Sequence, residues 1–352
     1  MSEGLTRIQE VIAKAAATGT PLCIRGGGSK DFYGREPSGE VLATTAHSGI
    51  VAHEPSELVI TARAGTPLRE LTAQLNAAGQ MLGFEPPQFG DNATIGGIVA
   101  TGLSGSRRPY SGSVRDFVLG IQCINGRAEL LSFGGQVMKN VAGYDVSRLM
   151  TGALGTLGLI TEVSMKVLPA PEQETTLRCS VSADRAIDLF TEWARQPLPI
   201  SGASHVDGIL RLRLSGTEVG VAAARATLAA DEDPDGNDYW RQLGEQSIAF
   251  FNDPRPIWRL SVACAAPAPD VEGDLLIDWG GSLRWLKTGA NAEHIRAAAA
   301  RCGGHATLFR GGDRRGDIFH PLSPALLNWH HNLKRAFDPR GIFNPGRMYA
   351  EY

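Results

Sequence analysis

Apolar residues in the first part of the chain follow a helical spacing and then a strand spacing. Near the N-terminus they recur every three or four positions, which predicts an amphipathic helix that Gly19 and Pro21 end. The apolar positions of this helix are Leu5, Ile8, Val11, Ile12 and Ala15. Short apolar runs at 22–24 and 58–62 predict two strands, and each leads into a turn of small residues.

A second helix is predicted after the 58–62 strand. Thr66 is expected to cap its N-terminus with Pro67 at the first helical position, because a threonine hydroxyl accepts from backbone N–H groups and proline has no donor to lose there. Gly79 is expected to close the helix. Its apolar face consists of Leu68, Leu71 and Leu75.

A hairpin and a short helix complete this region. The apolar run 117–124 predicts a strand, Asn125-Gly126 predicts a type I′ turn, and residues 128–133 predict the returning strand. A short helix is expected over 145–150, followed from Ile160 by the alternation of a half-buried strand. Prolines at 169 and 171 then break the pattern, so we place a domain boundary there.

From residue 171 the pattern changes to strands and helices in alternation. The predicted strands are 177–181, 209–214 and 283–287, and the predicted helices are 186–194, 219–230 and 292–302. Two such β-α-β units predict a compact α+β domain of the ferredoxin-like kind. The acidic segment 231–238 lacks the glutamate of a calcium loop and is interpreted as a solvated loop. A last helix is expected from Ser323.

Composition narrows the class of protein. With 352 residues, 43% of them hydrophobic and 20% charged, the chain is expected to be globular with two domains. A net charge of −3 without clusters of lysine or arginine gives no reason to expect nucleic acid as a partner. Five separated cysteines without a CxxC pair suit a reducing cytoplasm. No window suits a signal peptide or a membrane span, so membrane contact is expected only through a partner.

Three glycine-rich stretches suggest a ligand site. Residues 92–120 hold six glycines among small residues, too many for a regular helix or strand interior. The segment RGGGSK (25–30) directly follows a predicted strand, as does Ala64-Gly65-Thr66. Such turns can present backbone N–H groups to anionic oxygens or to a flavin ring edge. Ordinary tight or flexible turns are an equally open interpretation, because neither GxxxxGK[ST] nor GxGxxG is present.

The glycine stretches also carry a resemblance to a known family. The segments that carry it are IRGGGS (24–29), ARAGTPL (62–68), ATIGGIVATG (93–102), YSGSVRDFVLG (110–120), GYDVSRLMTGALGTLGLITEV (143–163) and DPRGIFNPGRM (338–348). They resemble the PCMH-type FAD-binding family, of the vanillyl-alcohol-oxidase kind. Within it, the length and the stretch IDWGGSLRWLK are most similar to the shorter FAD-binding subunits of bacterial glycolate oxidases.

The resemblance implies an α+β fold with two domains and a returning tail. A PCMH-type FAD-binding domain of two subdomains would cover 1–170, and a ferredoxin-like α+β cap domain would cover 171–322. The C-terminal segment 323–352 would pack on the FAD domain.

It also implies roles in FAD binding for particular residues. The pyrophosphate would be held by Gly26, Gly27, Gly28 and Ser29, flanked by Arg25 and Lys30. The flavin side would be lined by Thr94, Gly96 and Gly97, with a wall completed by Ser104, Gly105, Tyr110, Gly112, Arg115 and Asp116. The adenosine half would contact Gly155 and Ile160.

Two departures from the family pattern bear on the chemistry. Relatives that attach FAD covalently in the first loop have a histidine where this chain has Ser29, so non-covalent FAD is expected. Relatives that oxidise D-2-hydroxy acids with a metal carry an HxGDGN(I/L)H stretch, whereas the corresponding region here reads GGHATLFRGGDRRGDIFHP. His330 and His331, about 100° apart on one helix, do not easily share a ligand. No metal site and no catalytic residue are therefore assigned.

Arg211 and Arg213 lie on one face of a predicted strand, where they could bind a carboxylate. Exposed strand arginines are common, and we interpret these two as such.

Three functions are compatible with the sequence. The first is an FAD-binding subunit of a glycolate (2-hydroxy acid) oxidase or dehydrogenase that makes glyoxylate and passes electrons to a non-oxygen acceptor. Its partners would be a homologous larger flavin subunit and an iron–sulfur subunit, in the cytoplasm or at the inner membrane through these partners. The second is a self-sufficient flavin dehydrogenase or oxidase. The third is a flavin-fold subunit whose FAD serves only as a scaffold or electron relay. The resemblance favours the first.

Overall fold

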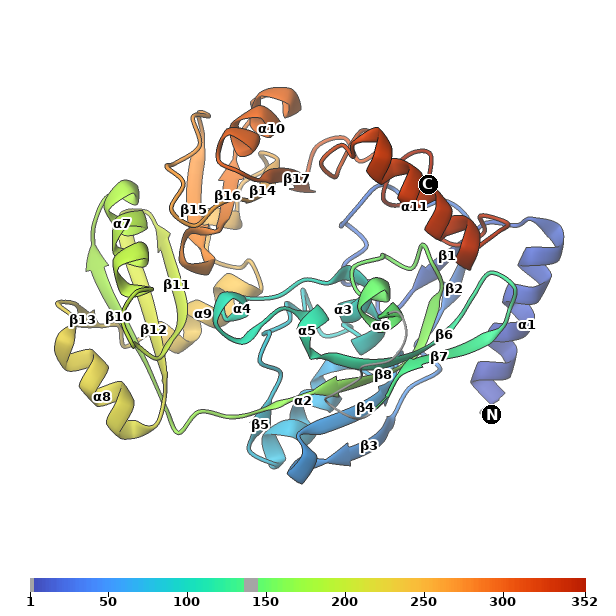
Figure 1. Cartoon of the computed structure of the whole chain (residues 1–352), viewed down its shortest axis with the longest axis horizontal. Coiled ribbons are helices and arrows are strands. Elements are labelled where there is room, and N and C mark those ends of the chain that lie inside the picture. The colour runs from blue at the N-terminus through green and yellow to red at the C-terminus, as the bar shows by residue number, and fades with distance from the viewer. Residues whose placement is uncertain (1–2, 136–144) are drawn as a thin grey trace. The chain divides into compact units, whose positions relative to one another are not determined.

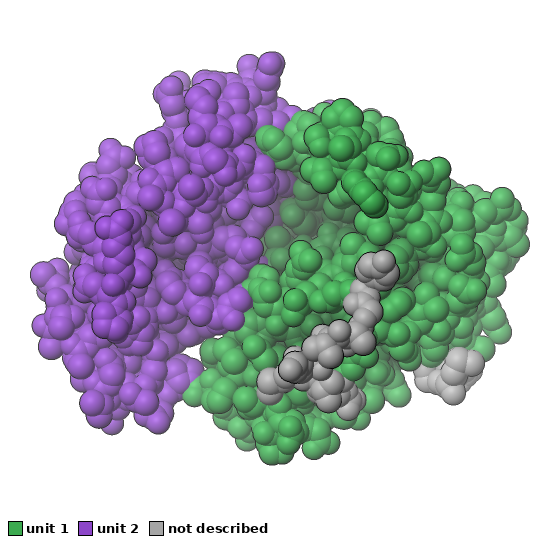
Figure 2. Space-filling model, in the orientation of Figure 1, with its two compact units in different colours: residues 1–103, 113–170, 314–352 green, residues 104–112, 171–313 purple. Residues whose placement is uncertain are grey.

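Two units make up the computed structural model, which describes residues 3–135 and 145–352 (Figure 2). The first unit comprises residues 1–103, 113–170 and 314–352, and the second comprises residues 104–112 and 171–313. The C-terminal segment therefore folds with the N-terminal region. Compared with the domain ranges expected from the sequence, 104–112 and 314–322 change sides.

Most of the first unit is built on an antiparallel sheet in the order β3-β4-β8-β6-β7 (Figure 1). Its strands are β3 (Ile50–Glu54), β4 (Val59–Arg63), β6 (Val118–Ile124), β7 (Leu130–Gly134) and β8 (Leu159–Lys166). Helices α2 (Leu68–Ala77) and α3 (Ile95–Thr101) bury Leu71, Leu75 and Ile98 in the same core. Because β8 is the central strand, it is buried more completely than the half-buried strand predicted from its alternation.

A smaller sheet in the first unit is a parallel pair of strands, β1 (Leu22–Arg25) and β2 (Glu40–Ala43). The C-terminal segment runs beside β1: Leu22 N donates to Ile342 O, and Asn344 N donates to Leu22 O. Helix α1 (Glu3–Thr18) packs its predicted apolar face here, with Leu22 and Phe343 in one cluster. The tail and the N-terminal helix are thus parts of one core.

The remaining elements of the first unit are short, apart from the last helix. They are η1 (Pro55–Glu57), α5 (Val114–Phe117), α6 (Val146–Met150), β5 (Gln80–Met81) and β9 (Leu168–Pro169). Helix α11 (Pro324–Phe337) begins after Ser323, whose hydroxyl accepts from Leu326 N, which confirms the predicted start. Among the described helices, none combines the length and the apolar character that crossing a bilayer requires.

Two local predictions in this unit are wrong in detail. Pro67, not Thr66, stands at the N-cap of α2, because the Thr66 hydroxyl is bonded to Gly49 and to Arg63 O instead. The hairpin between β6 and β7 exists, but its turn is not type I′: the residue with positive φ is Ala128 (61°) rather than Gly126. Gly126 N donates to Phe337 O, so contact with the tail sets this turn.

The second unit is built on an eight-stranded sheet in the order β13-β10-β12-β11-β15-β16-β14-β17 (Figure 1). Its strands are β10 (Gln173–Ser180), β11 (Ile200–Val206), β12 (Ile209–Gly216), β13 (Asp231–Glu232), β14 (Ile257–Ser261), β15 (Asp274–Asp278), β16 (Leu283–Lys287) and β17 (His305–Arg310). Its helices are α4 (Arg108–Ser111), α7 (Ala183–Trp193), α8 (Glu218–Thr227), α9 (Gly236–Gly244), α10 (Ala292–Arg301), η2 (Ala249–Phe251) and η3 (Trp279–Gly281).

This sheet consists of two halves with the same strand order. The first half runs β10-α7-β11-β12-α8-β13, which is the split β-α-β arrangement predicted from the sequence. The second half, β14-β15-β16-α10-β17, repeats the order of strands in mirror image along the sheet and lacks the first helix. The halves meet where β11 pairs with β15. The second unit therefore has an α+β fold, as predicted, and its sheet is larger than that of one ferredoxin-like unit.

Two arginines of the first half, Arg211 and Arg213, are half-buried or buried, contrary to the interpretation of the sequence. Arg213 is 3% exposed, lies over the ring of Trp240 and donates to Ser201. Arg211 donates to Asp233 at 2.8 Å. Neither is an exposed strand arginine. The segment 231–238 is mostly solvent-exposed as expected, but it is not simply a loop: it forms β13 and the start of α9, and Asp233 within it is buried as an ion-pair partner.

Candidate functional site

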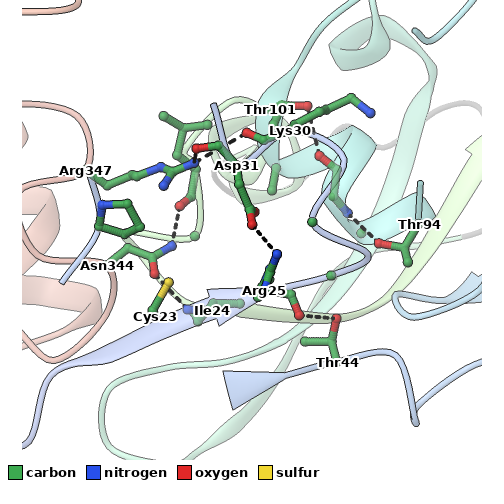
Figure 3. A pocket seen from close by; sticks show the side chains of 18 of the residues that line it. Cys23, Ile24, Arg25, Lys30, Asp31, Thr44, Thr94, Thr101, Asn344 and Arg347 are labelled. Atoms are coloured by element: carbon green, nitrogen blue, oxygen red, sulfur yellow. Dashed lines mark hydrogen bonds and ion pairs between the residues drawn. The ribbon is translucent and has the colours of Figure 1, made fainter. Parts of the chain in front are cut away.

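A cavity of about 430 Å³ lies in the first unit, where β1 ends (Figure 3). Its walls come from the loop after β1, from α3, from the segment before β8 and from the C-terminal segment. Eleven of the residues predicted from the sequence line it together: Arg25, Gly26, Gly27, Gly28, Ser29, Lys30, Thr94, Gly96, Gly97, Gly155 and Ile160. The structure therefore brings the three glycine-rich stretches to one place.

The loop after β1 approaches the segment before α3 so closely that side chains are excluded. A Cβ atom at Gly27 would lie 1.4 Å from Asn92 O, and one at Gly26 would lie 2.4 Å from the Thr94 hydroxyl. Gly27 is required by the fold itself, because backbone meets backbone there, whereas at Gly26 the Thr94 side chain occupies the space. The loop is also held across its ends by an ion pair of 2.6 Å between Arg25 and Asp31.

The two glycines of α3 differ in their surroundings. A Cβ at Gly96 would lie 2.6 Å from the Ala64 Cβ, so Gly96 lets α3 pack on the end of β4. At Gly97 the nearest atom is the Thr94 hydroxyl at 3.2 Å, and apart from the backbone of α3 itself no other atom of the described residues lies within 4 Å. That hydroxyl caps α3 by accepting from Gly97 N. Gly97 thus leaves one wall of the cavity flat where packing alone does not demand it.

The cavity is positively charged. Among the described residues its lining includes four cationic side chains, Arg25, Lys30, Arg314 and Arg347, against the two carboxylates Asp31 and Glu36. Lys30 is 7% exposed, and its Nζ donates to the Ser29 hydroxyl and to Gln88 O. Burial, and after it the charge of Arg314, lowers the pKa of Arg347. Such a lining favours an anionic ligand with several oxygens.

The C-terminal segment is fixed to the cavity wall by an amide and a buried ion pair. Asn344 Oδ1 accepts from Ile24 N at 2.8 Å, and its Nδ2 donates to Leu154 O at 2.6 Å (Figure 3). Lys334 Nζ donates to Thr156 O, Phe343 O and Asp338. Burial lowers the pKa of Lys334, although Asp338 opposes this shift. Both sides of the cavity are therefore positioned by residues from the chain end.

Six of the predicted residues are not among those that line this cavity. Ser104, Gly105, Tyr110 and Gly112 belong to the second unit. There Tyr110 lines a separate cavity of about 640 Å³ with Trp193 and Trp279, and burial raises its pKa. Arg115 and Asp116 are exposed in α5, where Asp116 accepts from the backbone N–H and hydroxyl of Ser113. Of the segment GYDVSRLM, Gly143 and Tyr144 lie outside the described residues.

Sequence reasoning missed the contribution of the tail. Arg314, Asn344 and Arg347 line the cavity but lie about three hundred residues from the loop that they face. The segment DPRGIFNPGRM was part of the resemblance, and its asparagine and arginine were the available signal. Among the described residues, no group of three or more His, Cys, Asp or Glu side chains is placed to hold a metal ion.

Known proteins resemble this chain in sequence and in fold. Residues 5–134 match the family model described as an FAD binding domain. The glycolate oxidase subunit GlcE of Escherichia coli (strain K12) is 52% identical over 97% of this chain and 96% of that protein. The glycolate oxidase subunit GlcD of Bacillus subtilis (strain 168) is 30% identical over 48% of this chain and 36% of that protein.

Among solved structures, 4-ethylphenol oxidase from Gulosibacter chungangensis superposes with a TM-score of 0.70 at 12% identity. The match covers 99% of this chain and 88% of the oxidase, and shows a shared fold. The α+β fold expected from the sequence is thereby confirmed. The family expected from the glycine motifs is confirmed as well. With identity above one half over nearly the whole length of both proteins, the chain belongs to the family of the glycolate oxidase subunit GlcE.

Proposed function

We propose that this chain is the FAD-carrying subunit of a multi-subunit glycolate dehydrogenase, which oxidises glycolate to glyoxylate and passes the electrons to an acceptor other than oxygen. The observation that carries the proposal is the 52% identity to the GlcE subunit over 97% of the chain. The match of residues 5–134 to an FAD binding domain supports the cofactor.

The cavity of the first unit fits FAD by its chemistry. A diphosphate needs several hydrogen-bond donors and positive charge, which the loop 26–29 with Arg25 and Lys30 offers. A planar ring system needs a flat wall of small residues, which Gly97 leaves free. When bound, the flavin supplies the chemistry of accepting a hydride equivalent, which carries two electrons.

We assign the residues of this chain to the parts of FAD as the resemblance implies. Gly26 to Ser29 would hold the diphosphate, Thr94, Gly96 and Gly97 the flavin side, and Gly155 and Ile160 the adenosine half. For the six predicted residues outside the cavity lining, the same role in the flavin wall stays a proposal. So does the division into an FAD domain (1–170), a cap domain (171–322) and a returning segment (323–352).

The names of the relatives support a multi-subunit complex. GlcE and GlcD are both subunits of glycolate oxidases, and GlcD shares 30% identity with part of this chain. We propose a homologous larger flavin subunit as the partner that holds the 2-hydroxy acid, and an iron–sulfur subunit as a further partner. Attachment to the inner membrane would come through these partners.

Non-covalent binding of FAD is the part of the proposal that this chain tests alone. Ser29 stands where covalent relatives have a histidine, so no bond to the flavin is expected in this loop. Acid precipitation of the purified yellow protein should leave FAD in the supernatant and a colourless pellet. Flavin that stays with the pellet would contradict non-covalent binding, and a protein that never retains FAD would contradict the proposed function itself.

A further inference from the structure

Two arginines of the C-terminal segment (residues 314–352) meet at the wall of the cavity. Arg314 donates to Asp31 O at 2.7 Å, and Arg347 donates to the same oxygen at 3.3 Å. Their charged groups are therefore close neighbours. Like charges this close destabilise each other, and more strongly where water is partly excluded. Arg347 is 9% exposed.

The hydrogen bonds of this pair go to backbone oxygens, and the charge of Asp31 offsets the charge of Arg347 only in part. Among the described residues, the hydrogen-bond acceptors of both guanidinium groups are backbone carbonyls: Arg314 also donates to Gly34 O and Arg35 O, and Arg347 also donates to Lys30 O. The nearest acidic side chain in the loop, Asp31, is engaged by Arg25 at 2.6 Å (Figure 3). Two adjacent cations whose hydrogen bonds go to backbone carbonyls, in a lining with more cationic than acidic side chains, are arranged for a ligand with two negative charges.

We propose that Arg314 and Arg347 bind the diphosphate of FAD, so that binding of the cofactor and docking of the C-terminal segment stabilise each other. This inference rests on the proposed function, since it concerns the same cavity. It adds a second group of ligands, from the far end of the chain, to the glycine loop after β1.

The coupling follows from how the segment is attached. Ile342 and Asn344 pair with Leu22 at the start of β1, and Arg347 follows three residues later. Arg35 N donates to Arg347 O, so the backbone of Arg347 is also held by the loop that surrounds the cavity. A diphosphate that relieves the repulsion between Arg314 and Arg347 therefore stabilises the docked tail, and by thermodynamic linkage the docked tail strengthens FAD binding.

The affinity of the full-length apoprotein for FAD tests the proposal directly. FAD is titrated by flavin fluorescence into the wild type, Arg347→Met and Arg314→Met at low and high salt. Each variant should bind FAD at least tenfold more weakly, with a smaller dependence on salt, because a charge-assisted contact is lost. Arg340→Met, on the same tail but exposed, and Arg315→Met, next to Arg314 and 83% exposed, are the matched controls and should bind as the wild type does.

Hydrogen–deuterium exchange separates binding from folding. ADP, which carries the diphosphate without the flavin, should slow amide exchange over residues 342–347 in the wild type and leave it unchanged in Arg347→Met. Arg347→Lys, which keeps the charge, should recover part of the FAD affinity, whereas a variant that is merely misfolded would not. Equal FAD affinity in Arg347→Met, Arg314→Met and the controls would overturn the inference, as would tail exchange that ignores ADP. Failure of the wild type to bind FAD would instead overturn the proposed function.

Discussion

Gly96 and Gly97 are neighbours in α3, yet only the first is fixed by packing within the protein. A side chain at Gly96 would meet Ala64, whereas one at Gly97 would meet only the Thr94 hydroxyl, at 3.2 Å. Gly97 lines the cavity, so we propose that its lack of a side chain leaves room for the ligand. A comparison of what each glycine would contact therefore separates residues that shape the fold from residues that shape the site.

Substitution of Gly97 tests this distinction. Gly97→Leu should fold and yet lose the visible absorbance of bound flavin, because the side chain would occupy the flat wall of the cavity. The cost in stability should be modest, on the order of 1 kcal/mol, since most of the space is open. Absorbance spectra and thermal unfolding of the apoprotein measure the two effects.

The matched control is Gly244→Leu. Gly244 ends α9, in the second unit, and a Cβ there would have nothing within 4 Å. This variant should keep its flavin. Normal flavin content in Gly97→Leu would show that α3 does not form a wall of the flavin site.

At the scale of elements, the segment 104–112 is held in the second unit by an acidic residue of β10. Arg107 donates to Glu174 at 2.5 Å, and the Ser215 hydroxyl donates to the same carboxylate at 2.5 Å. Arg213 lies 3.9 Å from it. Burial alone would raise the pKa of Glu174, but Arg213 and Arg107 outweigh burial and hold the pKa below its usual value.

The pH dependence of stability follows from the direction of this shift. A carboxyl group whose pKa is lower in the folded state contributes stability that is present above its unfolded pKa and is lost as the pH falls through its folded pKa. Glu174→Gln should therefore lower the free energy of unfolding by about 2 kcal/mol near neutral pH. The difference from the wild type should shrink as the pH falls below about 4, because protonation of the carboxyl then favours the unfolded state, and it should be lost once the pH is below the lower pKa of the folded state.

Urea unfolding at several pH values measures this difference. Glu172→Gln is the control, because Glu172 is an exposed neighbour whose carboxylate only reaches Glu218 N, at 3.4 Å. A Glu174→Gln deficit that stays constant from neutral to acidic pH would contradict an ionic role for Glu174.

Elements with a clear period were predictable from the sequence, and contacts between distant segments were not. Local pattern was enough to predict the apolar face of α1, the strand β1, the start of α11 at Ser323 and the glycine loop. Thr66 was misassigned because its hydroxyl has a partner seventeen residues away in Gly49. The residues that neighbour Thr66 in the sequence do not indicate such a distant partner.

The second unit and the cavity show the same limit. Strands β11, β14, β15 and β17 were missed because they are short and buried on both faces, so that alternation is weak. In the cavity, the glycines could be found from their density in the sequence. The charges could not, because Arg314 and Arg347 reach the cavity only when the chain end returns to β1.

At the scale of the whole molecule, cofactor binding and substrate oxidation are two different tasks. The first unit offers a charged cavity suited to a dinucleotide cofactor. The chain lacks the HxGDGN(I/L)H stretch of metal-dependent relatives, and no general base for an α-hydroxyl is assigned in it. We therefore propose that glycolate is oxidised in the complex and that this chain carries FAD.

Anaerobic mixing of the lone FAD-loaded protein with excess glycolate tests whether this chain oxidises glycolate by itself. The visible absorbance of the flavin is followed in time, and the complex recovered with the tagged chain from native membranes is treated in parallel. We expect negligible bleaching of the flavin in the lone protein and rapid reduction of the flavin in the complex that contains the larger flavin subunit. Bleaching of the flavin in the lone protein at a rate comparable to that in the complex would contradict a need for the larger subunit and would identify a self-sufficient dehydrogenase.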